Sequence, residues 1–211
     1  MCSPVFIKMS EEEIKPRRKS IRLQGYDYSQ PGVYFVTICT HDRNCLFGEI
    51  VDGRMILNEM GEIVESEWIK SPEIRSEIEL DVFQIMPNHF HAVVFIMDLH
   101  DDDSAVGATG RSPLQSNPNP SKGPRPKSLS SLIAGFKSAV TTNINHFRGI
   151  PGAKLWQRNY YDRIIRDDNE LNRIREYIIY NPLKWDLDHD NPQNWNSHTK
   201  NSLGDLNKVG V

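Results

Sequence analysis

Two histidines separated by one large apolar residue form the pattern in this chain that most suggests chemistry. His89 and His91 flank Phe90 at the start of a β-prone run. Successive side chains of a strand point to opposite faces, so both imidazoles share one face, about 7 Å apart along the strand. Such a pair can bind one divalent cation. On this spacing alone, a hydrogen-bonded pair of core histidines is an equally good interpretation.

A tyrosine and an asparagine near the end of the last helix-like segment form the second pattern. Tyr177 and Asn181 are four residues apart and therefore share a helix face. A helix laid across the histidine strand would bring a phenol and a carboxamide oxygen to the two imidazoles. Around one cation, this set suits phosphoryl transfer through a phosphotyrosine. With waters, these ligands suit Mg²⁺ or Mn²⁺, and Mn²⁺ accepts imidazole more readily than Mg²⁺ does.

Other tyrosines compete with Tyr177 for the role of nucleophile. Tyr160 and Tyr161 lie in an aromatic and basic segment, and Tyr180 lies on the same helix as Tyr177. Tyr180 points about 300° round the helix from Tyr177, so packing against a neighbour is the better interpretation of this residue. We therefore predict that Tyr177 is the nucleophile.

The strand that carries the histidines is expected to lie in the core. Its two faces are both apolar, and they carry Phe90, Ala92, Val94 and Ile96 on one side and Val93, Phe95 and Met97 on the other. A strand with two apolar faces is covered on both sides. A tight turn at Pro87-Asn88, in which Pro87 fixes φ and Asn88 tolerates unusual backbone angles, holds the first histidine at the start of this strand.

Strand-like and helix-like segments alternate along the rest of the chain. Strands are predicted at 33–40 and 78–86, and a hairpin at 47–57 with Asp52-Gly53 as its turn. Apolar residues repeat at helical spacing over 58–70 and 128–147, and Ser128 is the expected N-cap of the second of these helices. The segment 155–166 ends as a strand, and a helix begins at Asp167 and stops at Pro182.

The composition fits one domain with unstructured ends. The chain has 211 residues, of which 38% are hydrophobic and 25% are charged. Its net charge of −3 means that any contact with nucleic acid must use local patches. Three cysteines, an odd number without CxxC spacing, argue against a disulfide framework or a zinc cage. With neither a membrane-spanning stretch nor a signal peptide, an intracellular protein is expected.

Cationic residues gather in segments that suit phosphate contacts. The N-terminal arm, residues 1–24, and the later helix and strand supply Lys15, Arg17, Arg18, Lys19, Arg22, Lys137, Arg158, Tyr160, Arg163 and Arg166. Arg and Lys neutralise phosphates whatever the base sequence, and aromatic rings beside arginines suit stacking on unpaired bases. A solvated tail and an ordinary half-buried strand are the alternative interpretations of these segments.

Two further segments are predicted to be poorly ordered. Residues 100–127 are rich in Gly, Ser, Pro and Asn and read as a flexible surface insertion. Residues 186–211 form a C-terminal tail that reads as poorly ordered from about Asn191 and could either cover the site or do nothing. The expected catalytic domain therefore spans residues 25–185.

Three stretches resemble a known family. MPNHFHAVV, SLSSLIAGFKSAV and WQRNYYDRIIRDDNELNRIREYIIYNPLKW are similar to the single-tyrosine HUH transposases, and more closely to the REP-associated tyrosine transposases of bacteria. The match covers residues 25–185 without the insertion. The His-hydrophobic-His element and the Tyr-Ile-x-x-Asn-Pro helix end are highly specific as a pair.

The resemblance implies a fold, a reaction and residue roles. The family fold is α+β, a ferredoxin-like antiparallel sheet with helices packed on it. Its members cut single-stranded DNA beside a hairpin and join the 5′ phosphate through tyrosine. His89 and His91 match the HUH pair, Tyr177 matches the nucleophile, and Asn181 matches the third metal ligand. Some relatives carry His where this chain has Arg163.

We therefore predict a Mg²⁺- or Mn²⁺-dependent single-strand DNA endonuclease and strand transferase that acts near REP-like hairpins. It is expected in the bacterial cytoplasm at the nucleoid, as a monomer or homodimer. The alternative is a catalytically inactive, domesticated DNA hairpin-binding protein, which the intact histidine, tyrosine and asparagine set argues against. A metal-dependent phosphoesterase of small molecules is a third reading, which the basic and aromatic residues disfavour.

Overall fold

The central element is a four-stranded antiparallel sheet. It contains β1 (Gly32–Cys39), β4 (Ile78–Met86), β5 (His89–Ile96) and β6 (Tyr161–Ile165), in the order β4-β5-β1-β6. The computed structural model describes residues 26–98 and 124–194. The basic arm with Lys15, Arg17, Arg18, Lys19 and Arg22, residues 99–123 of the insertion, and the chain after Asn194 lie outside the described residues.

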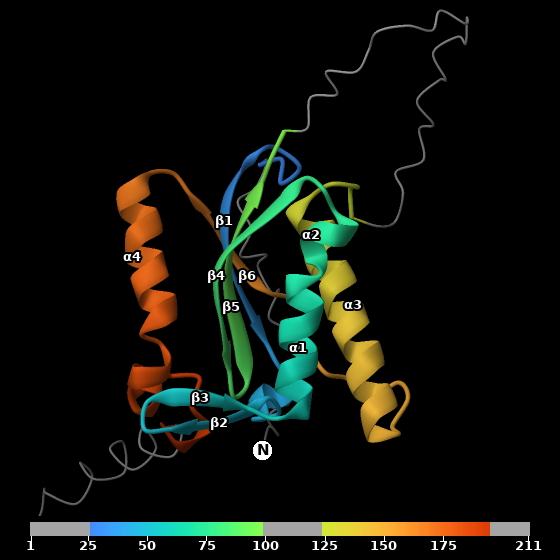
Figure 1. Ribbon diagram of the computed structural model, residues 1–211, viewed down its shortest axis with the longest axis vertical. Helices are drawn as coiled ribbons and strands as arrows, with labels where there is room; N and C mark the ends of the chain where they lie inside the picture. Colours follow the sequence, from blue (N-terminus) through green and yellow to red (C-terminus); the bar gives the residue numbers. More distant parts are fainter. Residues whose placement is uncertain (1–25, 99–123, 195–211) are drawn as a thin grey trace, which may run out of the picture.

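The connections give the sheet a ferredoxin-like topology. α1 (Glu59–Ile69) connects β1 to β4, and α3 (Leu129–Arg148) connects β5 to β6. The resulting β-α-β-β-α-β order, with these strand neighbours, is the ferredoxin-like motif. The predicted α+β fold, an antiparallel sheet with helices packed on it, is therefore confirmed (Figure 1).

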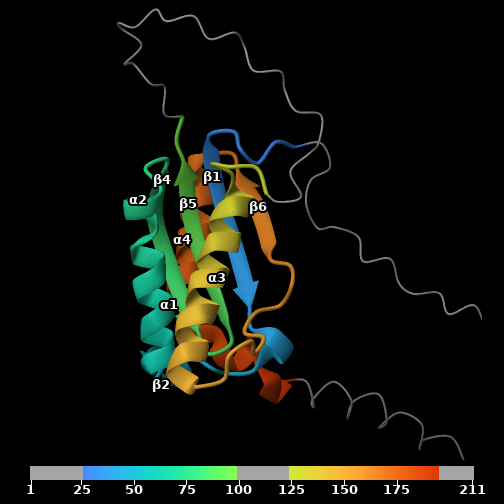
Figure 2. The same ribbon diagram turned by 90° about the vertical axis from the view of Figure 1, so that its right-hand side faces the viewer.

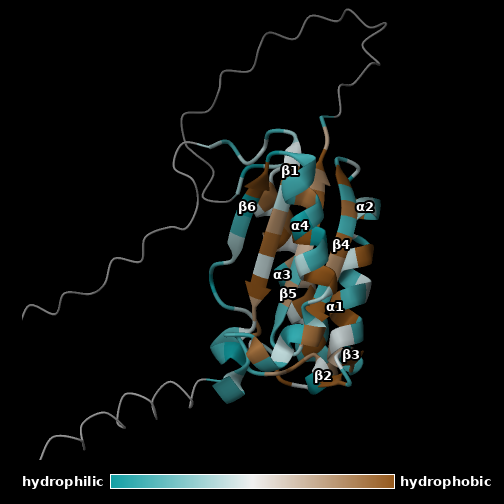
Figure 3. Ribbon diagram, turned by 90° about the vertical axis from the view of Figure 1, so that its left-hand side faces the viewer, coloured by the Kyte–Doolittle hydropathy of each residue, from teal (hydrophilic) through white to brown (hydrophobic). Residues whose placement is uncertain are grey.

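Helices cover both faces of the sheet. α1 and α3 lie side by side on one face (Figure 2), and α4 (Asp168–Ile179) lies alone on the other (Figure 1). The larger core cluster, on the α1 and α3 side, includes Phe90, Ala92, Val94 and Ile96, and the smaller one, under α4, includes Val93 with Phe95 packed against it. Figure 3 shows hydrophobic stretches of the strands on either side of α4. The prediction that both faces of the histidine strand are covered is confirmed.

The helices begin where side chains satisfy their first backbone N–H groups. Asn58 Oδ1 accepts hydrogen bonds from the N–H groups of Met60 and Gly61 at the start of α1. Ser128 and Ser131 form a reciprocal capping box at the start of α3. Asp167 accepts from the Glu170 N–H at the start of α4. All three helices therefore start within a residue or two of their predicted positions.

Short elements complete the described chain. The predicted hairpin is β2 (Gly48–Val51) and β3 (Arg54–Leu57), and its Asp52-Gly53 turn has positive φ at both residues, as a type I′ turn requires. α2 (Ser71–Ile74) and η1 (His41–Arg43) are single turns. η2 (Pro182–Leu187) and η3 (Pro192–Asn194) continue the chain beyond α4, through residues 186–194 of the expected tail. Among the described residues, every helix is too short or too polar to span a membrane.

Candidate active site

His89 and His91 lie at the start of β5 on the face that α4 covers. Both are almost fully buried, with 1% and 3% of their surface exposed. Their ring centroids are 4.5 Å apart, whereas alternate residues of a strand are about 7 Å apart, so the two rings lean toward each other. The sheet register places Cys39 opposite His89 and Thr37 opposite His91, on the neighbouring strand β1.

Each imidazole is oriented by a neighbour at its Nδ1 atom. His91 Nδ1 lies 2.8 Å from Thr37 Oγ1, and His89 Nδ1 lies 2.9 Å from Asn88 Oδ1. A partner at Nδ1 turns the Nε2 atom toward the site, which is how proteins commonly orient metal-binding histidines. His89 Nε2 is buried without a hydrogen-bond partner, and so is Oδ1 of the buried Asn181.

The predicted nucleophile reaches the histidines within one chain. Tyr177 Oη lies 3.4 Å from His91 Nε2, and the two rings meet edge to face with centroids 5.2 Å apart. Phe35 on β1 contacts both the Tyr177 and the His91 ring. Of the competing tyrosines, Tyr160 packs against the core on the α1 and α3 side, and Tyr180 is 50% exposed. Tyr161 on β6 lies nearer, opposite Thr37, with its ring centroid 6.1 Å from that of Phe35.

Burial dominates the electrostatics of the site. Loss of solvent lowers the pKa of His89 to about 4, with Asp188 and Asn181 opposing this shift and Arg43 adding to it. Burial, and then the neighbouring His89, hold the pKa of His91 well below its usual value. Both imidazoles are therefore neutral at pH 7, the form that binds metals. Burial raises the pKa of the Tyr177 phenol, and Asp188 raises it further.

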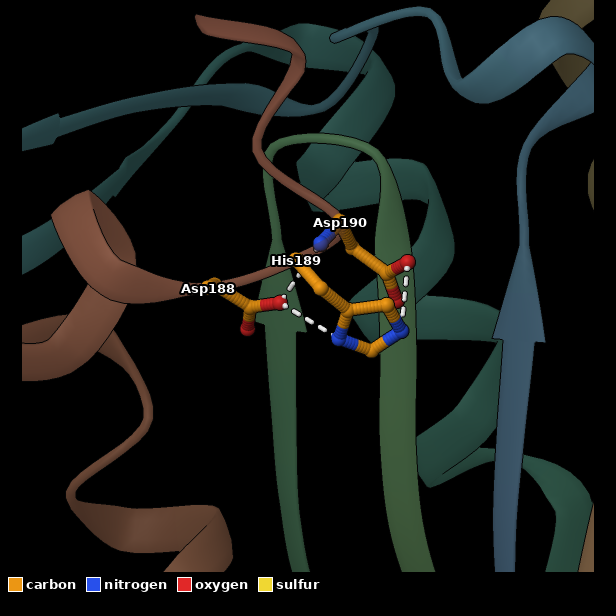
Figure 4. A group of neighbouring side chains, drawn as sticks. All are labelled: Asp188, His189 and Asp190. Atoms are coloured by element: carbon orange, nitrogen blue, oxygen red, sulfur yellow. Dashed lines mark hydrogen bonds and ion pairs between the residues drawn. The ribbon is translucent and has the colours of Figure 1, made fainter. Parts of the chain in front are cut away.

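A C-terminal segment that sequence reasoning assigned to the tail contacts this site. Asp190 forms an ion pair with Arg43, and its backbone carbonyl accepts a hydrogen bond from Asn88 Nδ2 at 2.7 Å. Figure 4 shows His189 between Asp188 and Asp190. These three residues offer ligand atoms within 4.8 Å of one another. The Asp190 carboxylate pairs with Arg43, and the Asp190 N–H donates to Asp188 Oδ1, so the group reads as a turn held by these two contacts.

The residues predicted to contact DNA have different surroundings. Lys137 Nζ donates to the carbonyl oxygens of Gln157 and Arg158, and burial lowers its pKa to about 8. Arg163 pairs with Glu170 and thereby ties β6 to the first turn of α4. Arg158 and Arg166 are exposed. Their roles, like those of Tyr160 and the N-terminal arm, stay predictions.

Three supporting residues went unassigned in the sequence interpretation: Thr37, Arg43 and Asp188. Asn88 was interpreted only as a turn former that tolerates unusual backbone angles. Its φ is not among the positive values in the described chain, and its side chain instead makes three hydrogen bonds. Its position directly before His89 was the sequence signal that could have indicated its contact with the imidazole.

No family model matches the chain, but individual proteins do. An uncharacterized protein of Haemophilus influenzae is 38% identical over 173 residues, which cover 81% of this chain and 91% of that protein. The chain belongs to the same family as this protein. A second Haemophilus influenzae protein, named "Putative REP-associated tyrosine transposase", is 23% identical over 162 residues, or 75% of this chain and 74% of that one. The resemblance to REP-associated tyrosine transposases is thus confirmed.

Two solved structures are also similar to the chain. One is a REP-associated tyrosine transposase bound to a REP hairpin, with a TM-score of 0.46 and 15% identity over 88% of this chain and 90% of that chain. The other is a Deinococcus radiodurans protein described as a "putative transposase", with a TM-score of 0.37 and 16% identity over 75% of this chain and 95% of that chain.

Proposed function

We propose that this chain is a metal-dependent single-strand DNA endonuclease and strand transferase that acts beside REP-like hairpins. The observation that best supports the proposal is the 3.4 Å distance between Tyr177 Oη and His91 Nε2 within one chain. A nucleophile and a potential cation site thus meet without help from a second subunit. The name of the 23% identical relative supports REP-like DNA as the substrate class.

The residues present fit a divalent cation. His89 Nε2, His91 Nε2 and Asn181 Oδ1 would hold it. Two of these atoms, His89 Nε2 and Asn181 Oδ1, are buried without a partner at hydrogen-bonding geometry, although the Asn181 side chain lies close enough to His89 to raise its pKa. A bound cation would satisfy both atoms. Imidazole nitrogens with a carboxamide oxygen suit Mn²⁺, and Mg²⁺ less well. When bound, the cation would withdraw charge from a phosphate oxygen and favour the phenolate form of the nucleophile.

The chain itself supplies the covalent step through Tyr177. Its phenolic oxygen attacks phosphorus, a bond forms between Oη and phosphorus, and the bond from phosphorus to O3′ breaks. The phenolic proton ends on the released 3′ hydroxyl. The 5′ phosphate stays on Tyr177 as a phosphodiester, which a second 3′ hydroxyl can attack to rejoin the strand.

Other side chains prepare Tyr177 for this step. Ile178 is fully buried against the sheet and fixes the rotation of α4, so that the preceding residue faces His91. Phe35 contacts the tyrosine ring edge on. Burial raises the pKa of Tyr177 further above neutral, so the phenol holds its proton in the free protein.

The test is a covalent trap. The protein is incubated with Mn²⁺ and a pool of single-stranded oligonucleotides that each carry one hairpin with randomised flanks, and adducts that survive denaturation are counted. Tyr177→Phe is expected to abolish the adduct and keep oligonucleotide binding. Tyr180→Phe is the matched control, because this exposed tyrosine lies on the same helix segment, and it is expected to keep the adduct. An adduct formed by Tyr177→Phe would refute the assignment.

The same experiment decides the alternative of a catalytically inactive hairpin-binding protein. That protein would bind the oligonucleotides with Mn²⁺ or with EDTA and form no adduct in either case. The proposed enzyme forms the adduct only with the cation. Failure to bind any oligonucleotide would instead favour a phosphoesterase of small molecules.

A further inference from the structure

Asn88 is a buried carboxamide, 1% exposed, that joins three separate segments of the chain. Its Oδ1 lies 2.9 Å from His89 Nδ1. Its Nδ2 donates to the backbone carbonyl of Arg43 at 3.0 Å and to that of Asp190 at 2.7 Å. The first contact is with a candidate metal ligand, and the other two are with the partners of one ion pair.

The three contacts determine which way the amide faces. Backbone carbonyl oxygens only accept hydrogen bonds, so both protons of the Nδ2 group must point at Arg43 and Asp190. The reverse orientation would place Oδ1 against two carbonyl oxygens and leave two donors unused. The amide oxygen therefore faces the imidazole of His89.

The orientation of the amide in turn fixes the histidine. A carboxamide oxygen can only accept, so the neutral His89 ring must carry its proton on Nδ1. Its Nε2 then keeps a free lone pair in the buried site. Thr37 does not determine the tautomer of His91, because a hydroxyl can either donate or accept at Nδ1.

The segments on the far side of Asn88 are themselves fixed in place. Thr40 Oγ1 donates to the carbonyls of Asn44 and Asn88, which holds the loop at residues 41–44 against the turn before β5. Asp42 and Arg43 both have φ of 54°, a left-handed conformation that is uncommon for non-glycine residues and least costly for residues such as aspartate. These contacts aim the Arg43 carbonyl at Asn88.

We propose that Asn88 is a positioning residue that holds His89 in its Nδ1-protonated tautomer, ready to bind a cation through Nε2. The Arg43 loop and the segment 188–190 hold the amide in the orientation that does so. The proposal rests on the proposed function only where it concerns the cation. The tautomer itself is a property of the protein without metal or DNA.

The first test is nitrogen-15 NMR of the imidazoles in metal-free, full-length protein at mildly alkaline pH. His89 is expected to show a protonated Nδ1 and an unprotonated Nε2. Asn88→Ala is expected to lose this preference. Asn88→Asp is expected to keep it in the folded protein, because a carboxylate still accepts from Nδ1, but to lower stability, because its second oxygen faces the two carbonyls that Nδ2 bonded. A proton on Nε2 in the wild type, or an unchanged tautomer in Asn88→Ala, would overturn the proposal.

The second test is a Mn²⁺ titration followed by electron paramagnetic resonance. Loss of a residue that orients a ligand typically weakens metal binding by about 10- to 100-fold, and we expect a loss of this size for Asn88→Ala. Asn88→Asp should lose less. Asn145→Ala is the matched control, since this buried asparagine of α3 bonds the Ala153 carbonyl away from the site, and it should bind Mn²⁺ as the wild type does.

The two tests separate the two proposals. An Nδ1-protonated His89 in a protein that binds no Mn²⁺ would refute the proposed function and leave the role of Asn88 intact. Mn²⁺ binding and adduct formation that are the same in wild type and Asn88→Ala would refute the role of Asn88 and leave the proposed function intact. A variant that fails to fold leaves the wild-type tautomer as the deciding measurement.

Discussion

Mild acid should destabilise the metal-free protein because His89 is buried as a neutral imidazole. Its pKa is about 4 in the folded chain, against about 6.5 for an unfolded histidine. Between these values the unfolded chain binds the extra proton and the folded chain does not. The free energy of unfolding therefore falls as the pH drops below about 6.5, and stops falling on this account below about 4.

The size of the effect follows from the two pKa values. At pH 5 the loss from His89 alone is about 2 kcal/mol, and near pH 4 it approaches about 3 kcal/mol. His91, whose pKa is also held low by burial, adds to the loss in the same direction. Aspartates and glutamates with ordinary pKa values contribute little between pH 7 and pH 5.

Urea denaturation in EDTA at pH 7 and pH 5 measures this loss. The wild type is expected to lose about 2 kcal/mol more than His89→Asn over this interval, because the variant has one buried imidazole fewer. His146→Asn, which removes an exposed imidazole of α3, is the control for the substitution itself. Equal losses in wild type and His89→Asn would refute the view that His89 is held neutral by burial.

Three further substitutions test the supports of the site. In an ordinary helix, replacing glycine by alanine stabilises by about 1 kcal/mol. Gly61→Ala should instead lower the melting temperature, because the added Cβ would overlap the Phe47 carbonyl oxygen. A higher melting temperature would contradict this. Ile178→Ala should cost about 2–5 kcal/mol in urea denaturation and reduce adduct yield, and a loss below 1 kcal/mol would show that α4 is held otherwise. Thr37→Val should weaken Mn²⁺ binding about 10-fold in an electron paramagnetic resonance titration, whereas unchanged affinity would mean that Thr37 does not orient His91.

The fold could be predicted from the sequence because its local signals agree with its packing. The Asp52-Gly53 turn, the Ser128 cap and the Asp167 cap each mark an element that the structure contains. The two apolar faces of the histidine strand correctly predicted layers on both sides of the sheet. Such signals act within a few residues, so a single sequence displays them.

The contacts around the histidines were harder to predict from the sequence. Thr37 reaches His91 from another strand, and Asn88 reaches Asp190 from a distance of 102 residues along the chain. Threonine and asparagine make the same hydrogen bonds in ordinary turns and strands, so neither residue type indicates which partner it has. The polar composition after Trp185 suggested a tail, whereas this part of the chain supplies Asp188 and Asp190 beside the site.

For the basic residues, too, the sequence shows local properties but not contacts between distant parts of the chain. Lys137 and Arg163 were predicted to contact DNA, and these contacts stay predictions. The sequence did not indicate that Lys137 bonds two backbone carbonyls or that Arg163 pairs with Glu170 across the junction of β6 and α4. The sequence shows the charge of a side chain but not the group that the side chain contacts in the fold.

The intrachain approach of Tyr177 to His91 has a consequence for stoichiometry under the proposed reaction. Each polypeptide carries a single attacking phenol at its histidine pair, so it can retain one severed DNA terminus at a time. Exchange between two termini then has to proceed in succession on one polypeptide, or simultaneously on two polypeptides that bring separate sites together. Counting covalently captured termini per polypeptide during a joining reaction distinguishes these routes.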